Sequence, residues 1–131
     1  MGRELATEEA IIEAAPDLVG MDIEVVVISR GKECITAATK GRIFKAVPPL
    51  VKVRSAVGVG DCTIAGLALK RVYRGPLIEA CRLAVAMGTA AVLTPGTELC
   101  HRADVERLLP QIEAQEMPAR RWAKAFFAAS N

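Results

Sequence analysis

Residues 53–61 constrain the fold most strongly, because an extended stretch there turns through two glycines directly into a helix. The segment reads Val-Arg-Ser-Ala-Val-Gly-Val-Gly-Asp, with Gly58 and Gly60 in the turn. Free backbone N–H groups at a helix N-terminus, together with the positive end of the helix dipole, stabilise a phosphate, and glycine lets the backbone approach it closely. The segment therefore predicts an anion-binding helix start.

Asp61 lies inside this turn, where a carboxylate would repel phosphate unless it had a separate task. Its natural task is that of a general base, which takes the proton from an acceptor hydroxyl during phosphoryl transfer. The alternative is that the glycines only make a tight turn and Asp61 caps the helix. The turn alone supports both interpretations equally, since short glycine patterns recur by chance. It is not a Walker A loop, which requires G-x-x-x-x-G-K-[ST].

Runs of apolar and β-branched residues before the turn predict strands. Residues 23–29 form a short, nearly all apolar run, which is typical of a strand buried on both faces of an α/β sheet. Residues 34–39 and 42–47 predict a hairpin that turns at Lys40-Gly41. Pro48 and Pro49 should end it, because proline cannot donate to a sheet ladder.

Helical periodicity marks four segments. Thr7 predicts the capped start of the first, which should end near Gly20. Two more helices follow the glycine turn, with a break at Gly75-Pro76, and the second of them is apolar around much of its circumference and should be deeply buried. The three later apolar stripes are Ile64, Leu67, Ala68 and Val72; Leu77, Ile78, Cys81, Leu83, Ala84, Val85 and Met87; and Val105, Leu108, Leu109 and Ile112. Residues 113–118 read as a linker to a terminal helix carrying Trp122, Phe126 and Phe127.

Composition limits the classes of function. The chain has 131 residues, 52% of them hydrophobic, which suits one ordinary core, and its net charge of +2 is scattered, so nucleic acid binding has no electrostatic support. No run approaches the ~20 apolar residues that cross a bilayer, and the N-terminus lacks a signal-peptide core, so we expect a cytoplasmic protein without a membrane partner. The four cysteines form no C-x-x-C pair, and the single histidine, His101, beside Cys100, suits a surface or capping role, so a metal centre of protein side chains is not expected.

The turn and several collinear segments resemble one family. Residues 57–61, followed by Ala65-Gly66, resemble the G-A-G-D signature of the ribokinase-like, phosphofructokinase-B carbohydrate kinases. Ser29-Arg30-Gly31 resembles the family's S-x-G nucleotide loop, and Val47-Pro48-Pro49 the segment that leads to the catalytic turn. Residues 86–91 and 96–100 resemble late segments of its sugar-phosphate branch, which includes 6-phosphofructokinases of the minor type, 1-phosphofructokinases and tagatose-6-phosphate kinases.

This resemblance implies a fold and a domain division. Residues 1–112 would be the C-terminal, ATP-binding half of a ribokinase-like three-layer α/β/α domain, with a short β-hairpin and several helices. Residues 113–131 would be an unmatched, helical tail.

The resemblance also implies roles for individual residues. Asp61 would be the catalytic base, and the Gly58, Val59 and Gly60 amides would form the anion hole. Mg²⁺ would arrive with ATP. The positions matching the nucleotide site are Ser29, Arg30, Gly31, Lys32, Cys34, Ala56 and Thr89, and those matching a monovalent cation site, with K⁺ the candidate, are Ser55, Val57, Ala91, Thr94 and Gly96.

The chain departs from the family pattern in several places. Cys34 replaces the third glycine of S-x-G-x-x-G, which predicts a strained left-handed backbone there. Ala56 replaces a common threonine, and Val59 replaces the smaller alanine between the glycines. Family members are also much longer, and their first half supplies the sugar site, the lid and an N-x-x-E motif. We therefore expect little kinase activity from this chain alone, and an open hydrophobic edge covered by a homodimer partner or by the missing N-terminal half.

Three functions remain open at this point. The first is ATP-dependent phosphorylation of a sugar phosphate, of the 6-phosphofructokinase, 1-phosphofructokinase or tagatose-6-phosphate kinase type, by a truncated chain that binds nucleotide and sugar phosphate. The second is a non-catalytic module that binds nucleotide or another protein, which the residues at positions 34, 56 and 59 favour. The third is a structural remnant without a ligand.

Overall fold

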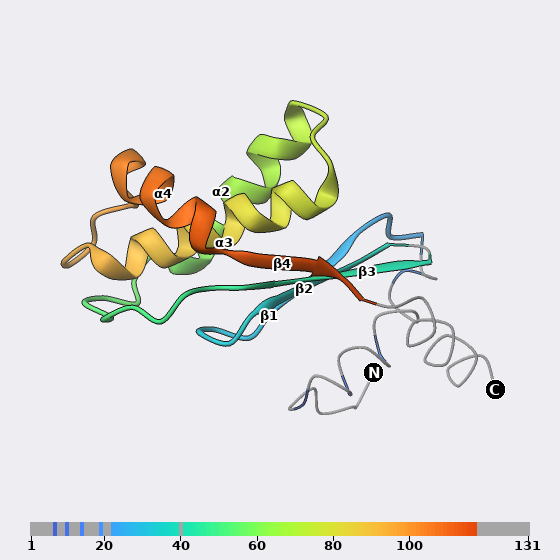
Figure 1. Ribbon diagram of the computed structural model, residues 1–131, viewed down its shortest axis with the longest axis horizontal. Coiled ribbons are helices and arrows are strands. Elements are labelled where there is room, and N and C mark those ends of the chain that lie inside the picture. Colours follow the sequence, from blue (N-terminus) through green and yellow to red (C-terminus); the bar gives the residue numbers. More distant parts are fainter. Residues whose placement is uncertain are drawn as a thin grey trace.

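The computed structural model describes residues 7, 10, 14, 19, 22–39 and 41–117. Within these residues, four strands form one sheet, and three α-helices and a short 3-10 helix lie on one side of it (Figure 1). The strands are β1 (Val26–Ser29), β2 (Ile35–Thr39), β3 (Arg42–Val47) and β4 (Glu113–Glu116), and the helices are α2 (Val59–Val72), α3 (Leu77–Leu93), α4 (Arg102–Leu108) and the 3-10 helix Leu109–Gln111.

The sheet has the order β1-β2-β3-β4 and is antiparallel at every pairing. The predicted hairpin is confirmed: Thr39 pairs with Arg42 across the turn, and Gly41 has φ 90°, a conformation that glycine adopts without a steric penalty. The strand expected at residues 23–29 is shorter, and the burial expected on both its faces is wrong. Val26, Val27 and Ile28 are only half-buried, because β1 is the edge strand of the described sheet.

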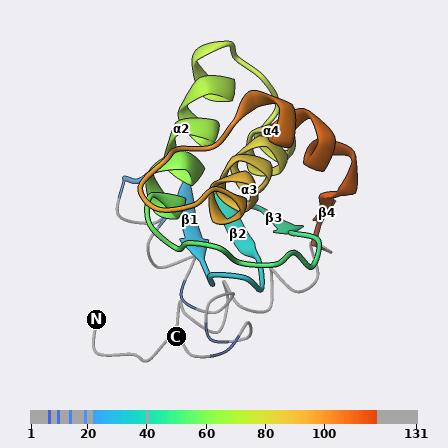
Figure 2. The same ribbon diagram turned by 90° about the vertical axis from the view of Figure 1, so that its left-hand side faces the viewer.

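The helices lie on one face of the sheet, and α3 is the α-helix that contacts its strands. α3 lies across the sheet, α2 lies beside it on the β1 side, and α4 lies toward β4 (Figure 2). The α/β class is confirmed. The core between sheet and helices is built from Ile35, Ala37, Phe44, Ala46, Cys81, Ala84, Val85, Ala86 and Ile112. On the opposite face, helical Val19 packs against Ala38, Ile43 and Met117, which supplies a contact from a third layer.

α3 is buried as its composition predicted, but the stripe predicted on α2 is wrong. Of its residues, only Leu67 packs against the core, whereas Ile64 and Val72 are 65% and 75% exposed. The helix instead contacts α3 through small residues: a Cβ added at Gly66 would lie 2.7 Å from Ala84 Cα, so the two backbones approach closely. Close helix packing through glycine leaves the larger apolar side chains pointing elsewhere.

The linker expected at residues 113–118 is also wrong in its first part. Residues 113–116 form β4, which pairs with β3 over Val47↔Glu113 to Phe44↔Glu116. Arg42 holds the far end of this pairing, because its Nε and Nη2 atoms donate to the two Glu116 carboxylate oxygens, each at 2.9 Å. Pairing and a bidentate ion pair thus override a sequence with little strand propensity.

The ends of the chain are described only in part. The Ala10 amide donates to Thr7 Oγ1 at 3.1 Å, which confirms the predicted helix cap. The rest of that helix, and Trp122, Phe126 and Phe127, lie outside the described residues. Within the described residues, no helix has the length and apolar character to cross a membrane.

Candidate active site

The glycine turn begins α2 in the geometry that the sequence predicted. Gly58 is the N-cap residue, with φ 79° and ψ 0°, and its carbonyl accepts the first helical hydrogen bond from the Cys62 amide at 3.0 Å. The amides of Val59, Gly60 and Asp61 precede that bond, so none has an acceptor within the helix. These donors and the positive end of the helix dipole form a site suited to an anion.

The structure requires glycine at only one of the two glycine positions of the turn. Gly58 has a left-handed backbone, which a side chain would strain. Gly60 lies outside that region, and a Cβ added to it would meet no atom within 4 Å. Neither the backbone nor the packing therefore requires glycine at position 60. The open space in front of Gly60 fits the close approach of a phosphate.

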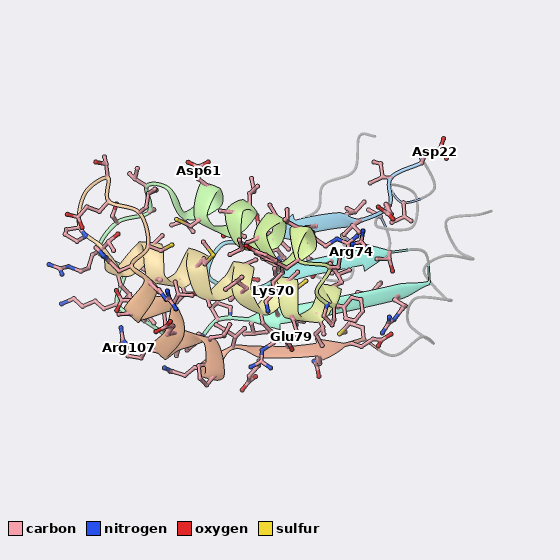
Figure 3. The ribbon with its side chains drawn as sticks, turned by 90° about the horizontal axis from the view of Figure 1, so that it is seen from above. Asp22, Asp61, Lys70, Arg74, Glu79 and Arg107 are labelled. Atoms are coloured by element: carbon pink, nitrogen blue, oxygen red, sulfur yellow. The ribbon has the colours of Figure 1, made fainter. Side chains whose placement is uncertain are left out.

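Asp61 does not cap α2, so that alternative is wrong. The N-cap is Gly58, no side-chain cap bond is formed, and Asp61 lies within the first turn of the helix. Its side chain is exposed and points outward from α2, away from α3 (Figure 3). The carboxylate is thus beside the free amides and accessible to a molecule that approaches from outside.

The predicted nucleotide loop joins β1 to β2. The Arg30 amide donates to the Cys34 carbonyl at 2.9 Å, and the Glu33 amide donates to the Arg30 carbonyl at 3.1 Å. Gly31 turns the loop with φ 55°, while Lys32 at its tip is exposed. The loop follows Ser29 and lies at the same end of the sheet as the start of α2 (Figure 1).

The strain expected at Cys34 is wrong. Among the described residues, only Asp22 and Arg74 have a positive φ without being glycine. Cys34 is instead 2% exposed, so its thiol is a small buried side chain that anchors the loop to the sheet. The loop closes without the third glycine.

The other two predicted nucleotide residues differ in access. Ala56 is exposed and precedes the glycine turn. Thr89 is buried in α3, and its hydroxyl donates to the Val85 carbonyl at 2.7 Å. The Thr89 hydroxyl therefore already has an internal partner.

The predicted cation positions gather where α3 ends. Ser55 Oγ donates to the Gly96 carbonyl at 2.8 Å and accepts a bond from the Val57 amide at 3.2 Å. The Thr94 hydroxyl donates to the Ala91 carbonyl at 2.9 Å. The amides of residues 54 and 55 both donate to the Val92 carbonyl. Hydroxyl and carbonyl oxygens at the negative end of a helix dipole suit a hard cation, so this donor set fits K⁺.

Leu99 is a neighbour of the turn that neither periodicity nor composition indicated. Leu99 packs over it, since a Cβ added at Gly58 would lie 3.5 Å from Leu99 Cδ2. Cys100, next in the chain, has its pKa raised to about 11, by burial and by a contact with Cys62 on the first turn of α2. His101 starts α4 and its side chain is exposed, as expected.

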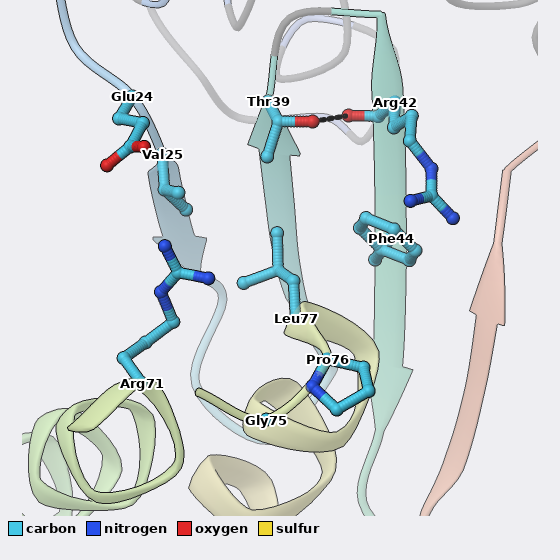
Figure 4. Close-up of a pocket in the computed structure, with 9 residues that line it drawn as sticks. All are labelled: Glu24, Val25, Thr39, Arg42, Phe44, Arg71, Gly75, Pro76 and Leu77. Carbon is cyan, nitrogen blue, oxygen red and sulfur yellow. Dashed lines mark hydrogen bonds between the residues drawn. The ribbon is translucent and has the colours of Figure 1, made fainter. Parts of the chain in front are cut away.

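A separate hollow of about 390 Å³ lies at the opposite end of the sheet, between the residues just before β1, the adjoining ends of β2 and β3, and the α2–α3 connection (Figure 4). Arg71, Pro76 and Leu77 line it from the helices, and Arg42 and Phe44 from the sheet. It is remote from the glycine turn. In the described part of the chain, no three His, Cys, Asp or Glu residues are grouped to hold a metal ion.

Comparison with known proteins decides the family. Residues 1–104 match the pfkB family of carbohydrate kinases. The chain belongs to the pfkB family of carbohydrate kinases. It is 33% identical over 109 residues to ATP-dependent 6-phosphofructokinase isozyme 2 of Escherichia coli K12, covering 82% of this chain and 35% of that protein. It is 34% identical over 116 residues to 1-phosphofructokinase of Vibrio cholerae, covering 88% of this chain and 37% of the relative.

Solved structures of this pfkB family show the same fold. Phosphofructokinase-2 from Escherichia coli in complex with potassium superposes with a TM-score of 0.79 at 33% identity, covering 83% of this chain and 36% of that one. This pfkB chain therefore spans about a third of the length of the relatives it matches.

Proposed function

We propose that this chain supplies the ATP-binding and catalytic-base part of a kinase that phosphorylates a sugar phosphate, of the 6-phosphofructokinase, 1-phosphofructokinase or tagatose-6-phosphate kinase type. The observation that carries the proposal is the α2 start, where amides without helical acceptors adjoin an exposed carboxylate. Family membership supports the same chemistry.

The residues of the turn would divide the work of phosphoryl transfer. The Val59 and Gly60 amides donate to oxygens of the transferring phosphoryl group, where negative charge accumulates. The Asp61 carboxylate takes the proton from the acceptor hydroxyl as its oxygen attacks phosphorus, and the bond from phosphorus to the leaving nucleoside diphosphate breaks. Helix α2 places both functions within one turn.

Nucleotide and ions would bind around this turn. The β1–β2 loop and exposed Ala56 would lie along ATP, and Mg²⁺ would enter with the nucleotide. The oxygens of Ser55, Thr94 and Gly96 would hold K⁺, which would supply positive charge beside the anion hole. A potassium complex is known for the phosphofructokinase-2 relative.

The acceptor sugar phosphate requires a wall that faces Asp61. Since the chain spans 35% of the Escherichia coli relative, we place that wall in chain beyond these 131 residues. Positioning provides much of the rate in phosphoryl transfer, so the chain alone should bind nucleotide with little turnover.

A non-catalytic nucleotide-binding module is the second candidate function. The observation that favours it is exposed Ala56, a position without a hydroxyl to face phosphate. Such a module would bind ATP but would not need Asp61.

Two measurements test these functions. Calorimetry with ATP·Mg should give saturable heat with the wild-type chain, and the absence of heat would contradict nucleotide binding of either kind. Turnover should be followed with fructose 6-phosphate, fructose 1-phosphate and tagatose 6-phosphate, in the chain supplied with the complementary part of a relative. Asp61→Asn should abolish turnover and keep ATP binding, whereas the matched control Asp104→Asn, in an exposed ion pair with Arg107, should leave both unchanged. Robust turnover in Asp61→Asn would remove its role as base.

A further inference from the structure

The Thr63 hydroxyl holds a backbone carbonyl of the glycine turn. Thr63 lies one turn after the start of α2, and its Oγ1 atom donates to the Val59 carbonyl oxygen at 2.8 Å. The helical pattern already gives this carbonyl the Thr63 amide as a donor, so the hydroxyl is a second donor to the same oxygen. A bond of this kind slightly destabilises a helix, so the stability of α2 does not explain it.

The Val59 carbonyl and the Gly60 amide belong to one peptide unit. Because this unit is planar and trans, a donor that fixes the direction of the carbonyl also fixes the direction of the N–H group on its opposite side. A hydrogen bond to the carbonyl polarises the unit and strengthens the N–H group as a donor. The Gly60 amide has no acceptor within the helix, and the space in front of Gly60 is open. The Thr63 hydroxyl therefore acts on an amide that is free to meet a ligand.

Thr89 makes the same type of bond without this consequence. Its hydroxyl donates to the Val85 carbonyl at 2.7 Å in the middle of α3. The amide of the same peptide unit is that of Ala86, which has a helical acceptor one turn earlier in α3. The position of Thr63 in the first turns of α2, and not the bond alone, gives it a free amide to direct.

Gly88 leaves space for the Thr63 hydroxyl on the neighbouring helix. α3 lies beside α2 (Figure 3), and a Cβ added at Gly88 would overlap Thr63 Oγ1. The same Cβ would lie 3.6 Å from the Val59 carbonyl oxygen and 3.7 Å from Thr63 Cβ, which are ordinary contacts. Threonine in a helix divides between two χ1 rotamers, because its hydroxyl can bond a carbonyl of the preceding turn. Gly88 therefore permits the rotamer in which Thr63 bonds Val59.

These contacts assign Thr63 a role in phosphate binding. We propose that Thr63, in the space that Gly88 leaves, is a positioning residue of the anion hole: it orients and polarises the Val59–Gly60 peptide, so that the Gly60 amide donates to a phosphate oxygen of the nucleotide. Thr63 acts through this peptide and does not itself contact the ligand. The proposal rests on the proposed function for the identity of the anion.

Substitution of Thr63 in the 131-residue chain tests the proposal. Thr63→Val keeps the branched shape without the hydroxyl, and Thr63→Ser keeps the hydroxyl. The ¹⁵N chemical shift of the Gly60 amide is measured without ligand, and the Kd for ATP·Mg is measured by calorimetry. Thr63→Val should move the shift and raise the Kd by about two- to tenfold, the range expected for one hydrogen bond, and Thr63→Ser should keep both at the wild-type values. The Tm of Thr63→Val should match or exceed that of the wild type, because the lost bond is one that slightly destabilises a helix.

Gly88→Ala tests the space beside the hydroxyl. Its methyl group should turn the Thr63 hydroxyl away from the Val59 carbonyl, and so reproduce the effects of Thr63→Val on the shift and the Kd. In a Thr63→Ala background, where Oγ1 is absent, Gly88→Ala should change neither quantity further. Thr39→Val is the matched control, because it removes a hydroxyl that bonds the Arg42 carbonyl at the far end of the sheet. It should leave both quantities at the wild-type values.

The contrary outcomes are distinguishable. An unchanged Gly60 shift in Thr63→Val, or an unchanged Kd in this variant beside a wild type that binds, refutes positioning by Thr63. Equal effects of Thr63→Val and Thr63→Ser also refute it, because the hydroxyl would then not be the group that acts. If the wild-type chain does not bind ATP·Mg, the proposed function is refuted, and the Gly60 shift of the ligand-free chain decides by itself whether Thr63 directs that amide.

Discussion

Substituting Gly60 with alanine should separate phosphate binding from folding. The added methyl group meets no atom within 4 Å, and the residue is the second of α2. Alanine at a compatible position stabilises a protein by about 0.4–1 kcal/mol, chiefly through the unfolded chain. For a domain of this size that corresponds to a rise of about 2–4 °C in Tm.

The same methyl group should weaken nucleotide binding. It would stand where a phosphate approaches the amides, and hydrogen bonds to charged groups contribute about 1.5–3 kcal/mol each. The loss of one bond corresponds to a Kd for ATP·Mg higher by about 10- to 150-fold. Calorimetry measures the affinity, and circular dichroism measures Tm on the same preparation.

Gly58→Ala is the matched control for this pair of effects. At φ 79° an alanine should lose about 1–2 kcal/mol of stability, because the left-handed backbone crowds its Cβ. The two substitutions thus shift Tm in opposite directions. If Gly60→Ala bound ATP·Mg as tightly as the wild type, the assignment of these amides to phosphate would be refuted.

Three further substitutions test the packing. Arg74 has a left-handed backbone just after α2, where the Gly75 amide donates to the Lys70 carbonyl at 2.8 Å. Glycine adopts this conformation without strain, so Arg74→Gly should raise the free energy of unfolding by about 0.5–1 kcal/mol in urea titrations. Thr36 Oγ1 is buried with no partner in the described structure, so Thr36→Val should stabilise by about 1 kcal/mol in the same assay, and a loss of stability would show that the hydroxyl is satisfied. The hydrogen bonds from Arg42 lower the pKa of Glu116, so this ion pair stabilises the fold above pH 4.5 and the contribution is lost as the pH falls below that value. Glu116→Gln should therefore melt below the wild type at pH 7, and the difference in Tm should shrink as the pH is lowered below 4.5.

The local features of the fold were predictable because their causes are local. The β2–β3 hairpin follows from apolar runs around a glycine with a positive φ, and two prolines end it. The α2 start follows from Gly58, whose conformation the turn requires. β4 was not predictable in this way: Glu-Ala-Gln-Glu has little strand propensity, and its pairing depends on β3, whose Arg42 lies 74 residues from Glu116.

The candidate site likewise combines residues that are neighbours in the chain with residues that only the fold brings together. The proposed anion hole and base are consecutive residues, so the local pattern indicated them beside the alternative of a capped tight turn. The cation positions are not: Ser55 reaches the Gly96 carbonyl across 41 residues of chain, and only the family resemblance joined them before the structure did. Leu99 and Cys100, which pack against the turn, had no signal that periodicity or composition could reveal.

The apolar stripe of α2 is exposed, although its periodicity predicted a buried face, and the reason is physical. An apolar stripe predicts a buried helix face only if everything that buries it belongs to the same chain. Here α3 contacts a different face of α2, through Gly66, and the stripe with Ile64 and Val72 remains exposed. Exposure of that stripe costs solubility unless a partner covers it. The mismatch between periodicity and burial thus reflects a helix that packs through its small residues and not through its apolar stripe.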